Sequence, residues 1–246
     1  MTLEPAAFRA ELIRVFAENG LEPLLSDDKA DALTAFADRL VRENEKFNLT
    51  ALTSPSEIIL RHFADCAALI PYLKNGGGLL DVGCGAGFPS LVIAILCPDR
   101  SVAALDATAK KVTFVRETAA SLGLSNLHTL VGRAETLAAP GSPLRESFDA
   151  VTARAVARLG VLSELCLPFV KVGGTFLAMK GPAAEAEAGE AARAIPQLGG
   201  RLEGVFARTL SNGTETLTHA TVKIGKVKKT PPEYPRNYAR ILKKPL

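Results

Sequence analysis

The sequence predicts a doubly wound α/β domain with a mainly parallel sheet, preceded by a helical extension. Three observations carry this prediction. Apolar residues recur at helical spacing over residues 1–75, and short apolar runs alternate with helical stretches from residue 76 onward. The first of those runs leads directly into a glycine-rich turn. Alternating strands and helices are typical of βαβ units, and such a turn at a strand end is typical of their ligand sites.

The first 75 residues are predicted to be helical. Apolar residues lie three or four positions apart over residues 8–16 and 33–41, as on the buried face of a helix. Residues 48–55 break this pattern, and a further helical stretch runs from about residue 56 to residue 73. Residues 1–75 therefore form a predicted helical region ahead of the sheet.

Residues 76–225 are predicted to form the α/β domain itself. The predicted strands are 79–82, 102–105, 127–131, 148–153 and 173–179. The predicted helices are 89–97, 110–122, 159–169 and 183–194. Two strand-like runs, 202–210 and 216–224, close the domain with no helical stretch between them. Two consecutive strands predict an antiparallel edge on an otherwise parallel sheet.

Composition narrows the class of protein. The chain has 246 residues, of which 48% are hydrophobic, enough for one sizeable core and a smaller addition. Its apolar runs are too short to cross a membrane, and residues 1–12 lack the basic and apolar regions of a secretory signal. The cysteines are widely spaced, without a CxxC pair, and only three histidines are present. We therefore expect a cytoplasmic protein with no metal and no disulfide framework.

Positive charge is concentrated at the C-terminus. Residues 223–246 hold eight basic residues and one acid, a charge of +7, which leaves −4 for residues 1–222. Prolines at 231, 232 and 235 predict an extended segment. We interpret residues 226–246 as a basic tail that contacts a polyanion, with a solvated, disordered tail as the alternative.

The glycine-rich turn is the most informative local pattern. Residues 79–88 read LLDVGCGAGF, so an apolar strand passes through Asp81 into a turn that contains Gly83, Gly85 and Gly87. Glycines let the backbone approach a ligand where a Cβ would collide. Asp106 ends the next predicted strand, where a carboxylate can accept hydrogen bonds from the two hydroxyls of a ribose. These residues predict a nucleoside-containing cofactor.

Two cofactors suit this geometry. A dinucleotide site has the spacing GxGxxG and places a pyrophosphate at the helix N-terminus. This turn reads GCGAG, and the carboxylate of Asp81 would repel a pyrophosphate but attract the cationic amino-acid end of S-adenosylmethionine, directly or through water. The pattern therefore favours S-adenosylmethionine. The alternative for Asp81 is a structural role in capping the turn.

Two later strand ends carry further candidates. Ala134 and Glu135, in the sequence GRAE, stand where backbone or carboxylate can meet an adenine edge, although an ordinary turn fits as well. Arg154, in TARA, ends the fourth strand of the domain. Its guanidinium can pair with a cofactor carboxylate, hold a substrate phosphate, or bridge to a neighbouring acid.

Taken together, these patterns resemble one family over nearly the whole chain. The matching stretches are NEKFNLTAL (44–52), RHFAD (61–65), DVGCGAGFPS (81–90), LD (105–106), GRAE (132–135), TARA (152–155), KG (180–181) and YPRNYARILKKPL (234–246). The chain is similar to the GidB or RsmG family of bacterial small-subunit ribosomal RNA methyltransferases, which methylate N7 of a guanine in 16S rRNA. The combination is specific, although each piece alone is not.

The resemblance implies a fold, a cofactor and a set of contacts. It implies a Rossmann-like class I methyltransferase that uses S-adenosylmethionine and releases S-adenosylhomocysteine. The first glycine of the turn and the bulky residue after it contact the cofactor, which implies Gly83 and Phe88 here, and the ribose contact falls on Asp106. The remaining implied contacts are Ala134, Glu135 and Arg154. The family often has serine where this chain has Ala107, so contacts at that position are in doubt.

The implied reaction needs no catalytic triad. N7 of guanine carries an in-plane lone pair and no proton, so it can attack the methyl group without a general base. Candidates to surround the target base are Asn48, Arg61, His62, Asp65, Arg154 and Lys180. His62 has the alternative of a hydrogen-bonded histidine at the junction between helices and sheet, and Asn48 that of a turn former.

The implied partner is 16S rRNA or the small ribosomal subunit. A monomer is the simplest expectation for the oligomeric state, and no membrane contact is expected from the short apolar runs. The predicted RNA contacts are Lys180, Lys226, Lys228, Lys229, Arg236, Arg240, Lys243 and Lys244. Tyr234 and Tyr238 are interleaved with them and can stack on unpaired bases. If the tail only binds RNA, its removal after Lys229 should weaken RNA binding and leave cofactor affinity unchanged.

Two other functions remain open at this point. One is a methyltransferase for another RNA or for a small molecule, with an incidental tail. The other is an RNA-binding or ribosome-assembly module whose nucleoside pocket is vestigial. The intact Asp81, Gly83 and Asp106 argue against the second alternative.

Overall fold

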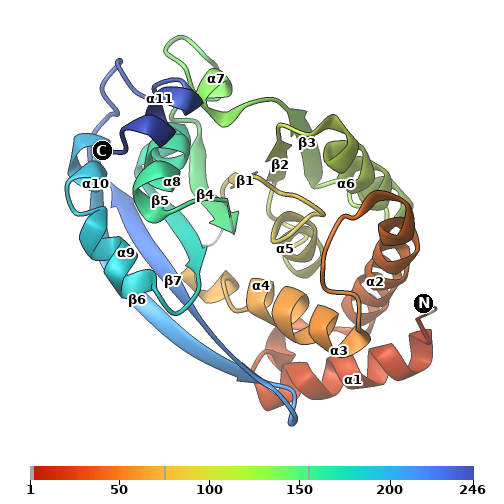
Figure 1. Ribbon diagram of the computed structural model, residues 1–246. Helices are drawn as coiled ribbons and strands as arrows, with labels where there is room; N and C mark the ends of the chain where they lie inside the picture. The colour runs from red at the N-terminus through yellow and green to blue at the C-terminus, as the bar shows by residue number, and fades with distance from the viewer. Residues whose placement is uncertain (1–2, 75, 155) are drawn as a thin grey trace.

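The computed structural model describes residues 3–74, 76–154 and 156–246 and contains one seven-stranded sheet (Figure 1). The strands are β1 (Leu79–Val82), β2 (Val102–Asp106), β3 (Leu127–Val131), β4 (Phe148–Arg154), β5 (Val170–Lys180), β6 (Gly200–Ser211) and β7 (Thr216–Lys226). Their order is β3-β2-β1-β4-β5-β7-β6. β1 to β5 are parallel, while β7 runs antiparallel to both β5 and β6. The predicted mainly parallel sheet with an antiparallel edge is confirmed.

The order of the strands creates a switch point beside β1. From β1 the chain moves outward to β2 and β3, and then returns to the other side of β1 for β4 and β5. Leu80 pairs with Ala103 on one side and with Val151 on the other, so β1 is hydrogen-bonded along both edges. In open α/β sheets, ligands bind beyond the carboxyl ends of the strands at such a point. The topology therefore places a candidate site after β1, β2 and β4.

Helices cover both faces of the sheet, and this explains why β1 is buried throughout. On one face lie α5 (Ser90–Leu96) and α6 (Ala109–Ser121), together with the N-terminal helices. On the other lie α7 (Ala134–Leu137), α8 (Leu159–Cys166), α9 (Ala184–Glu190), α10 (Ala194–Gln197) and α11 (Tyr238–Lys243). The predicted helix 183–194 is interrupted after α9, beside Gly189, a residue with low helix propensity.

The N-terminal helices share their core with the sheet. They are α1 (Pro5–Glu18), α2 (Asp27–Phe47), α3 (Pro55–Glu57) and α4 (Asp65–Ala67), with a π-helical segment, Ile58–Ala64, joining α3 to α4. The ring of Phe36 lies 5.5 Å from that of Phe63 and 5.2 Å from that of Phe88, which follows the glycine-rich turn. The described residues of the stretches 1–75 and 76–225 therefore pack around common apolar side chains.

The long β6–β7 hairpin reaches the N-terminal region (Figure 1). Arg14 on α1 donates a hydrogen bond to the carbonyl of Asn212 at 2.7 Å, and Asn19 donates to the carbonyl of Ser211 at 2.7 Å. The antiparallel edge therefore holds α1 in place. No helix among the described residues is long and apolar enough to span a membrane.

The C-terminal segment packs on the domain, and the predicted extended tail is wrong. α11 lies against α8 with Ile241 buried, and Arg236 donates two side-chain hydrogen bonds to the buried carboxylate of Glu164, at 2.6 and 2.8 Å. Arg145 donates to four carbonyl oxygens, those of Ala138, Thr230, Pro231 and Tyr234. Three carbonyl groups of the proline-containing segment thus accept hydrogen bonds from the guanidinium of Arg145, and the segment packs on the domain.

Removing the cation from the buried pair should destabilise the protein. Arg236→Ala leaves Glu164 buried without its partner, so we expect the free energy of unfolding to fall by about 3 kcal/mol in a urea titration. Arg158→Ala is the matched control, since the Arg158–Glu190 pair is 65% and 56% exposed. That variant should lose about 0.5 kcal/mol or less. Equal losses for the two variants would contradict the structural role of Arg236.

Candidate functional site

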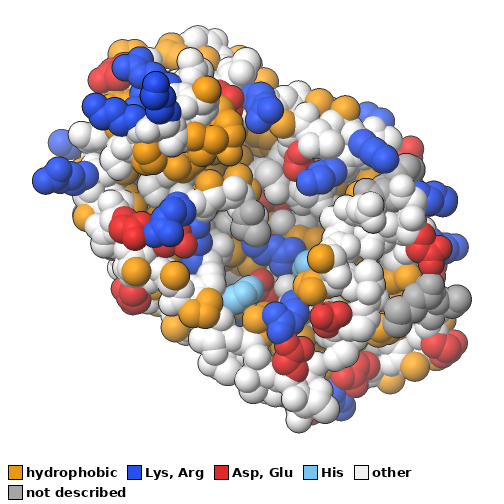
Figure 2. All heavy atoms as spheres, in the orientation of Figure 1, with side chains coloured by type: hydrophobic (Ala, Val, Ile, Leu, Met, Phe, Trp, Pro, Cys, Tyr) orange, Lys and Arg blue, Asp and Glu red, His pale blue; other side chains and the backbone are white. Residues whose placement is uncertain are grey.

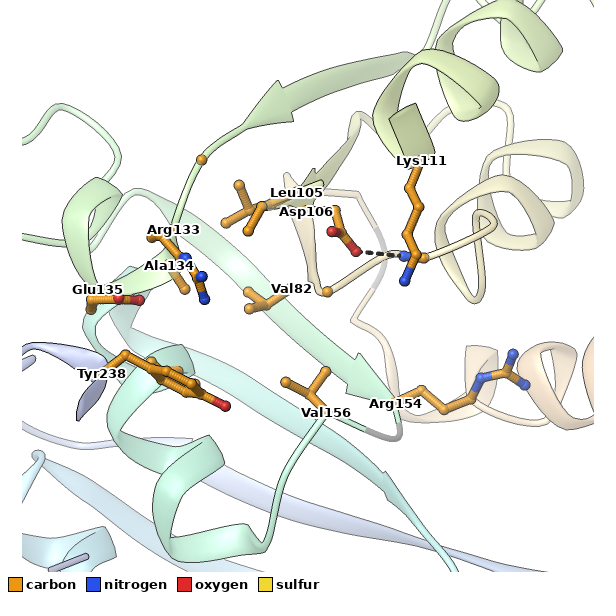
Figure 3. Close-up of a pocket in the computed structure, with 15 residues that line it drawn as sticks. Val82, Leu105, Asp106, Lys111, Arg133, Ala134, Glu135, Arg154, Val156 and Tyr238 are labelled. Atoms are coloured by element: carbon orange, nitrogen blue, oxygen red, sulfur yellow. Dashed lines mark hydrogen bonds between the residues drawn. The ribbon is translucent and has the colours of Figure 1, made fainter. Parts of the chain in front are cut away.

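A pocket of about 360 Å³ opens at the carboxyl ends of β1, β2 and β4 (Figure 3). Its wall comes from the turn after β1, the end of β2, the residues between β3 and α7, the end of β4, and α11. Figure 2 shows a hollow in the middle of this face, with basic, acidic and histidine side chains around it. Pockets of this size bind small molecules in proteins, so the switch point carries a ligand-sized site.

The glycine-rich turn forms the floor of the pocket for steric reasons. Gly83 has φ +77°, and a Cβ there would lie 2.6 Å from Val156. Gly85 is also in the left-handed region and lines the pocket. Gly87 lies behind the wall, where a Cβ would come within 2.3 Å of Leu91 on α5. Gly83 and Gly85 thus stay candidate ligand contacts, whereas Gly87 allows α5 to pack closely.

Asp106 connects the turn to the next strand. Its Oδ2 accepts a hydrogen bond from the amide of Gly85 at 3.1 Å, drawn as a dashed line in Figure 3, and its Oδ1 accepts one from the amide of Thr108 at 2.8 Å. Each carboxylate oxygen can accept a second bond. Asp106 therefore holds the turn and presents acceptors to the pocket, as predicted for a ribose contact.

Asp81 does not reach the pocket, and the predicted direct contact with a cofactor is wrong. Its side chain is fully buried, accepting from the amide of Ser90 at 3.1 Å and from the hydroxyl of Thr152 at 3.3 Å. Burial raises the pKa of Asp81 to about 6. The carboxylate satisfies the first turn of α5, so its role in the structure is structural, at the helix and not at the glycine-rich turn.

Arg154 lines the pocket, but its guanidinium points elsewhere. Figure 3 shows the side chain directed away from Glu135 and Tyr238. Its Nη1 donates to the carbonyl of Arg61 at 3.0 Å, its Nη2 to Nδ1 of His62 at 2.9 Å, and Asp65 lies 3.6 Å away. Of the three predicted roles, the bridge to neighbouring groups is the one that this geometry supports.

His62 is a hydrogen-bonded histidine behind the pocket. Because Arg154 can only donate, Nδ1 of His62 accepts and the proton lies on Nε2, which is 3.0 Å from the hydroxyl of Thr50. The ring stacks on Phe88 at 4.1 Å. Burial, reinforced by the charge of Arg154, lowers the pKa of His62 to about 3. The imidazole of His62 is therefore neutral near pH 7. Phe88 packs against this imidazole and does not line the pocket, contrary to its predicted cofactor contact.

The other base-site candidates join elements together. Asp65 is buried, and its Oδ1 lies 2.8 Å from Nδ1 of His219 on β7, while Arg61 forms an ion pair with Glu215. Asn48 ends α2 in a left-handed conformation, as a turn former does. The structure thus gathers Arg61, His62, Asp65 and Arg154 beside the pocket.

Three of the predicted RNA contacts are corrected, two by burial and one by its bond to a buried acid. Lys180 is buried against Glu187 at 2.8 Å, which ties β5 to α9. Lys226 is 1% exposed, with Nζ 2.6 Å from the carbonyl of Leu167, and burial lowers its pKa to about 8. Arg236 is held by Glu164. The remaining five, Lys228, Lys229, Arg240, Lys243 and Lys244, are exposed.

Ala134 and Glu135 line the pocket, so their contact with an adenine stays a prediction, and the structure adds residues that the sequence did not single out. Lys111 on α6 faces the wall near Asp106, and Arg133 lies beside Glu135 (Figure 3). Tyr238 reaches the same wall from α11. Its nearness to a basic segment suggested base stacking, and nothing in the local sequence indicates that α11 packs beside the pocket.

The fold and the pocket define a class I S-adenosylmethionine-dependent methyltransferase. A SAM-dependent methyltransferase from Methanosarcina mazei superposes with a TM-score of 0.51 at 15% identity, over 66% of this chain and 98% of its own. Geranyl diphosphate C-methyltransferase from Streptomyces coelicolor, solved with S-adenosyl-L-homocysteine, has a TM-score of 0.50 at 16% identity, over 67% of this chain and 79% of its own. At these identities the similarity establishes the fold.

Sequence similarity identifies the family. GidB, described as rRNA small subunit methyltransferase G, matches residues 29–213. Ribosomal RNA small subunit methyltransferase G from Limosilactobacillus fermentum is 43% identical over 248 residues, which cover 99% of each chain. The chain belongs to this family, as its resemblance predicted.

Acidification should reveal the neutral state of His62. An unfolded chain protonates histidine near pH 6.5, whereas the folded chain does so at about pH 3, so stability is fully present above about pH 6.5 and is lost as the pH falls toward 3. Between pH 7 and 5, the wild type should lose about 2 kcal/mol more than His62→Asn, whose side-chain oxygen can still accept from Arg154. Parallel pH profiles from urea titrations would refute this assignment.

Asp106 should contribute directly to cofactor binding. Calorimetry with S-adenosylhomocysteine should show that Asp106→Ala weakens binding by at least about 1 kcal/mol, the scale of a hydrogen bond to a charged group. Asp99→Ala removes an exposed acid away from the pocket and should bind as the wild type does. Wild-type affinity in Asp106→Ala would remove Asp106 from the site.

Proposed function

We propose that this protein transfers the methyl group of S-adenosylmethionine to N7 of a guanine in the 16S rRNA of the small ribosomal subunit. The observation that carries the proposal is the pocket at the switch point, with Gly83 and Gly85 beneath it and Asp106 in its wall, in a chain of the rRNA small subunit methyltransferase G family. We further propose that it acts as a monomer in the cytoplasm.

The residues in the pocket fit this cofactor. The left-handed backbone at Gly83 and Gly85 leaves no side chain over the floor, so a ligand can lie against the turn. Asp106 offers free acceptor positions to ribose hydroxyls, and the wall near Ala134 and Glu135 offers backbone and carboxylate groups to an adenine edge. S-adenosylmethionine, once bound there, supplies an electrophilic methyl group on a positively charged sulfur.

The chain's own contribution is to orient the reactants and exclude water. Alignment of a nucleophile with its target can lower a barrier by several kcal/mol. No proton has to leave N7 before it reacts, and the titratable side chains behind the pocket are occupied in the structure. His62 is neutral and donates to Thr50, and Asp81 accepts from α5. A site arranged in this way suits a nucleophile that already has a free lone pair.

Exposed basic side chains beside the pocket favour a nucleic acid over a small-molecule substrate. Lys228, Lys229, Arg240, Lys243 and Lys244 are exposed, and Figure 2 shows basic side chains gathered over the region of α11. Such residues bind phosphates without regard to sequence, with an affinity that falls as salt increases. α11 itself contributes to the pocket wall, so this charge stands next to the site of methyl transfer.

The deciding experiment is methyl transfer with labelled S-adenosylmethionine. The purified protein is incubated with small subunits and with naked 16S rRNA, both prepared from cells that lack the modification, and the labelled nucleotide is mapped and identified. We expect label at N7 of one guanine. Label on free nucleosides, with no increase when rRNA is added, would instead support a small-molecule methyltransferase.

A further inference from the structure

The C-terminal segment supplies an aromatic wall to the pocket. Tyr238, the first residue of α11, lines it together with Arg133, Ala134 and Glu135 (Figure 3). The guanidinium of Arg133 lies 5.7 Å from the centre of the Tyr238 ring. In Figure 3, Tyr238 and Arg133 lie across the pocket from Asp106 and Lys111. The ring of Tyr238 therefore faces the end of the pocket where we place the adenine.

The opposite face of the same helix is basic. Ile241 follows Tyr238 by three positions, lies on the same side of α11 and is buried. Arg240 and Lys243 are also three positions apart, and both are exposed. A single short helix therefore presents one aromatic ring to the pocket and two cations to solvent.

The start of α11 is held rigidly on the domain. Asn237 accepts a hydrogen bond from the amide of Arg240 at 2.9 Å, and Arg236 is bound to the buried Glu164 directly before it. Arg145 holds the chain from Thr230 to Tyr234 through their carbonyl groups. Because the preceding segment is held on the domain, a ligand that binds the exposed residues of α11 affects the orientation of the Tyr238 ring.

We propose that Tyr238 contacts the adenine end of the cofactor, and that α11 couples cofactor binding to RNA binding through Arg240 and Lys243. Tyrosine stacks on bases, and lysine and arginine bind phosphates. RNA bound to the outer face of α11 holds this helix, and with it the ring of Tyr238, against the pocket. Linkage then requires that the cofactor strengthens RNA binding by the same factor. This inference rests on the proposed function, because it takes RNA as the partner.

The first test is cofactor binding in the absence of RNA. Calorimetry with S-adenosylhomocysteine should give about 10-fold weaker binding for Tyr238→Ala, the scale of one lost base–aromatic contact, and wild-type affinity for Tyr238→Phe. Tyr234→Ala is the matched control, because Tyr234 lies in the same segment, near Arg236, and does not line the pocket. It should bind as the wild type does, with urea titrations confirming that each variant is folded.

Tyrosine fluorescence distinguishes a contact between Tyr238 and the cofactor from a purely structural role of this residue. The chain has three tyrosines and no tryptophan, so its intrinsic fluorescence comes from tyrosine. Addition of S-adenosylhomocysteine should change this emission in the wild type and in Tyr234→Phe, and should leave it unchanged in Tyr238→Phe. An equal change in all three proteins would overturn the contact with Tyr238.

The second test measures coupling. A 16S rRNA transcript should strengthen S-adenosylhomocysteine binding to the wild type by about 5-fold or more. The double variant Arg240→Ala/Lys243→Ala should keep its affinity without RNA and lose the increase. Arg42→Ala/Arg116→Ala removes the same charge from exposed positions on α2 and α6 and should keep the increase.

The outcomes distinguish this inference from the function on which it rests. If the wild type fails to bind S-adenosylhomocysteine or to methylate rRNA, the proposed function fails. If the wild type does both, but Tyr238→Ala binds S-adenosylhomocysteine with wild-type affinity, the cofactor contact is overturned. If Arg240→Ala/Lys243→Ala retains the full effect of RNA, the coupling is overturned. In the last two cases the proposed function stands.

Discussion

The hydrogen bonds of the Arg154 guanidinium are the contact on which the arrangement of this site depends. Arg154 ends β4 with its stem at the pocket and its nitrogen atoms among the N-terminal helices. A charge withdrawn from water is costly unless it is paired and hydrogen-bonded. The carbonyl of Arg61, the ring of His62 and the carboxylate of Asp65 meet that need. The pocket edge and the N-terminal helices are therefore positioned together.

Behind the pocket wall, burial shifts the pKa values of two titratable groups in opposite directions. It lowers the pKa of His62 to about 3 and raises that of Asp81 to about 6, because each charged form is penalised away from water. Both side chains are engaged in hydrogen bonds that hold the turn and the helices. The wall itself includes glycine backbone, Asp106, the residues near α7 and Tyr238 on α11. Such a site selects by shape and orientation, and this suits transfer to a ring nitrogen that needs no deprotonation.

The positive charge of the C-terminal segment serves two purposes. Lys226 and Arg236 lie against the domain, where they hold Thr230 and Glu164. Arg240 and Lys243 face solvent on a helix whose other side carries Tyr238 and Ile241. Lys226 and Arg236 hold the segment on the domain, and this places the ring of Tyr238 at the pocket. The charge that forms one basic tail in the sequence is thus divided between side chains that hold the segment on the domain and side chains exposed to solvent.

The sequence by itself determined the order of the elements, the antiparallel edge, the glycine-rich turn and the place of Asp106. These features depend on periodicity and on residues that are neighbours along the chain, and such local patterns survive in any packing of the domain. Only the tertiary structure decided that Lys180 and Lys226 are buried and that Arg236 is bound to Glu164. It also decided that Asp81 and Phe88 lie behind the pocket wall and that Tyr238 lines it. These positions depend on partners distant in sequence, such as Glu146 for Lys226 and Glu164 for Arg236. A local pattern in the sequence does not show which of those distant segments will contact one another.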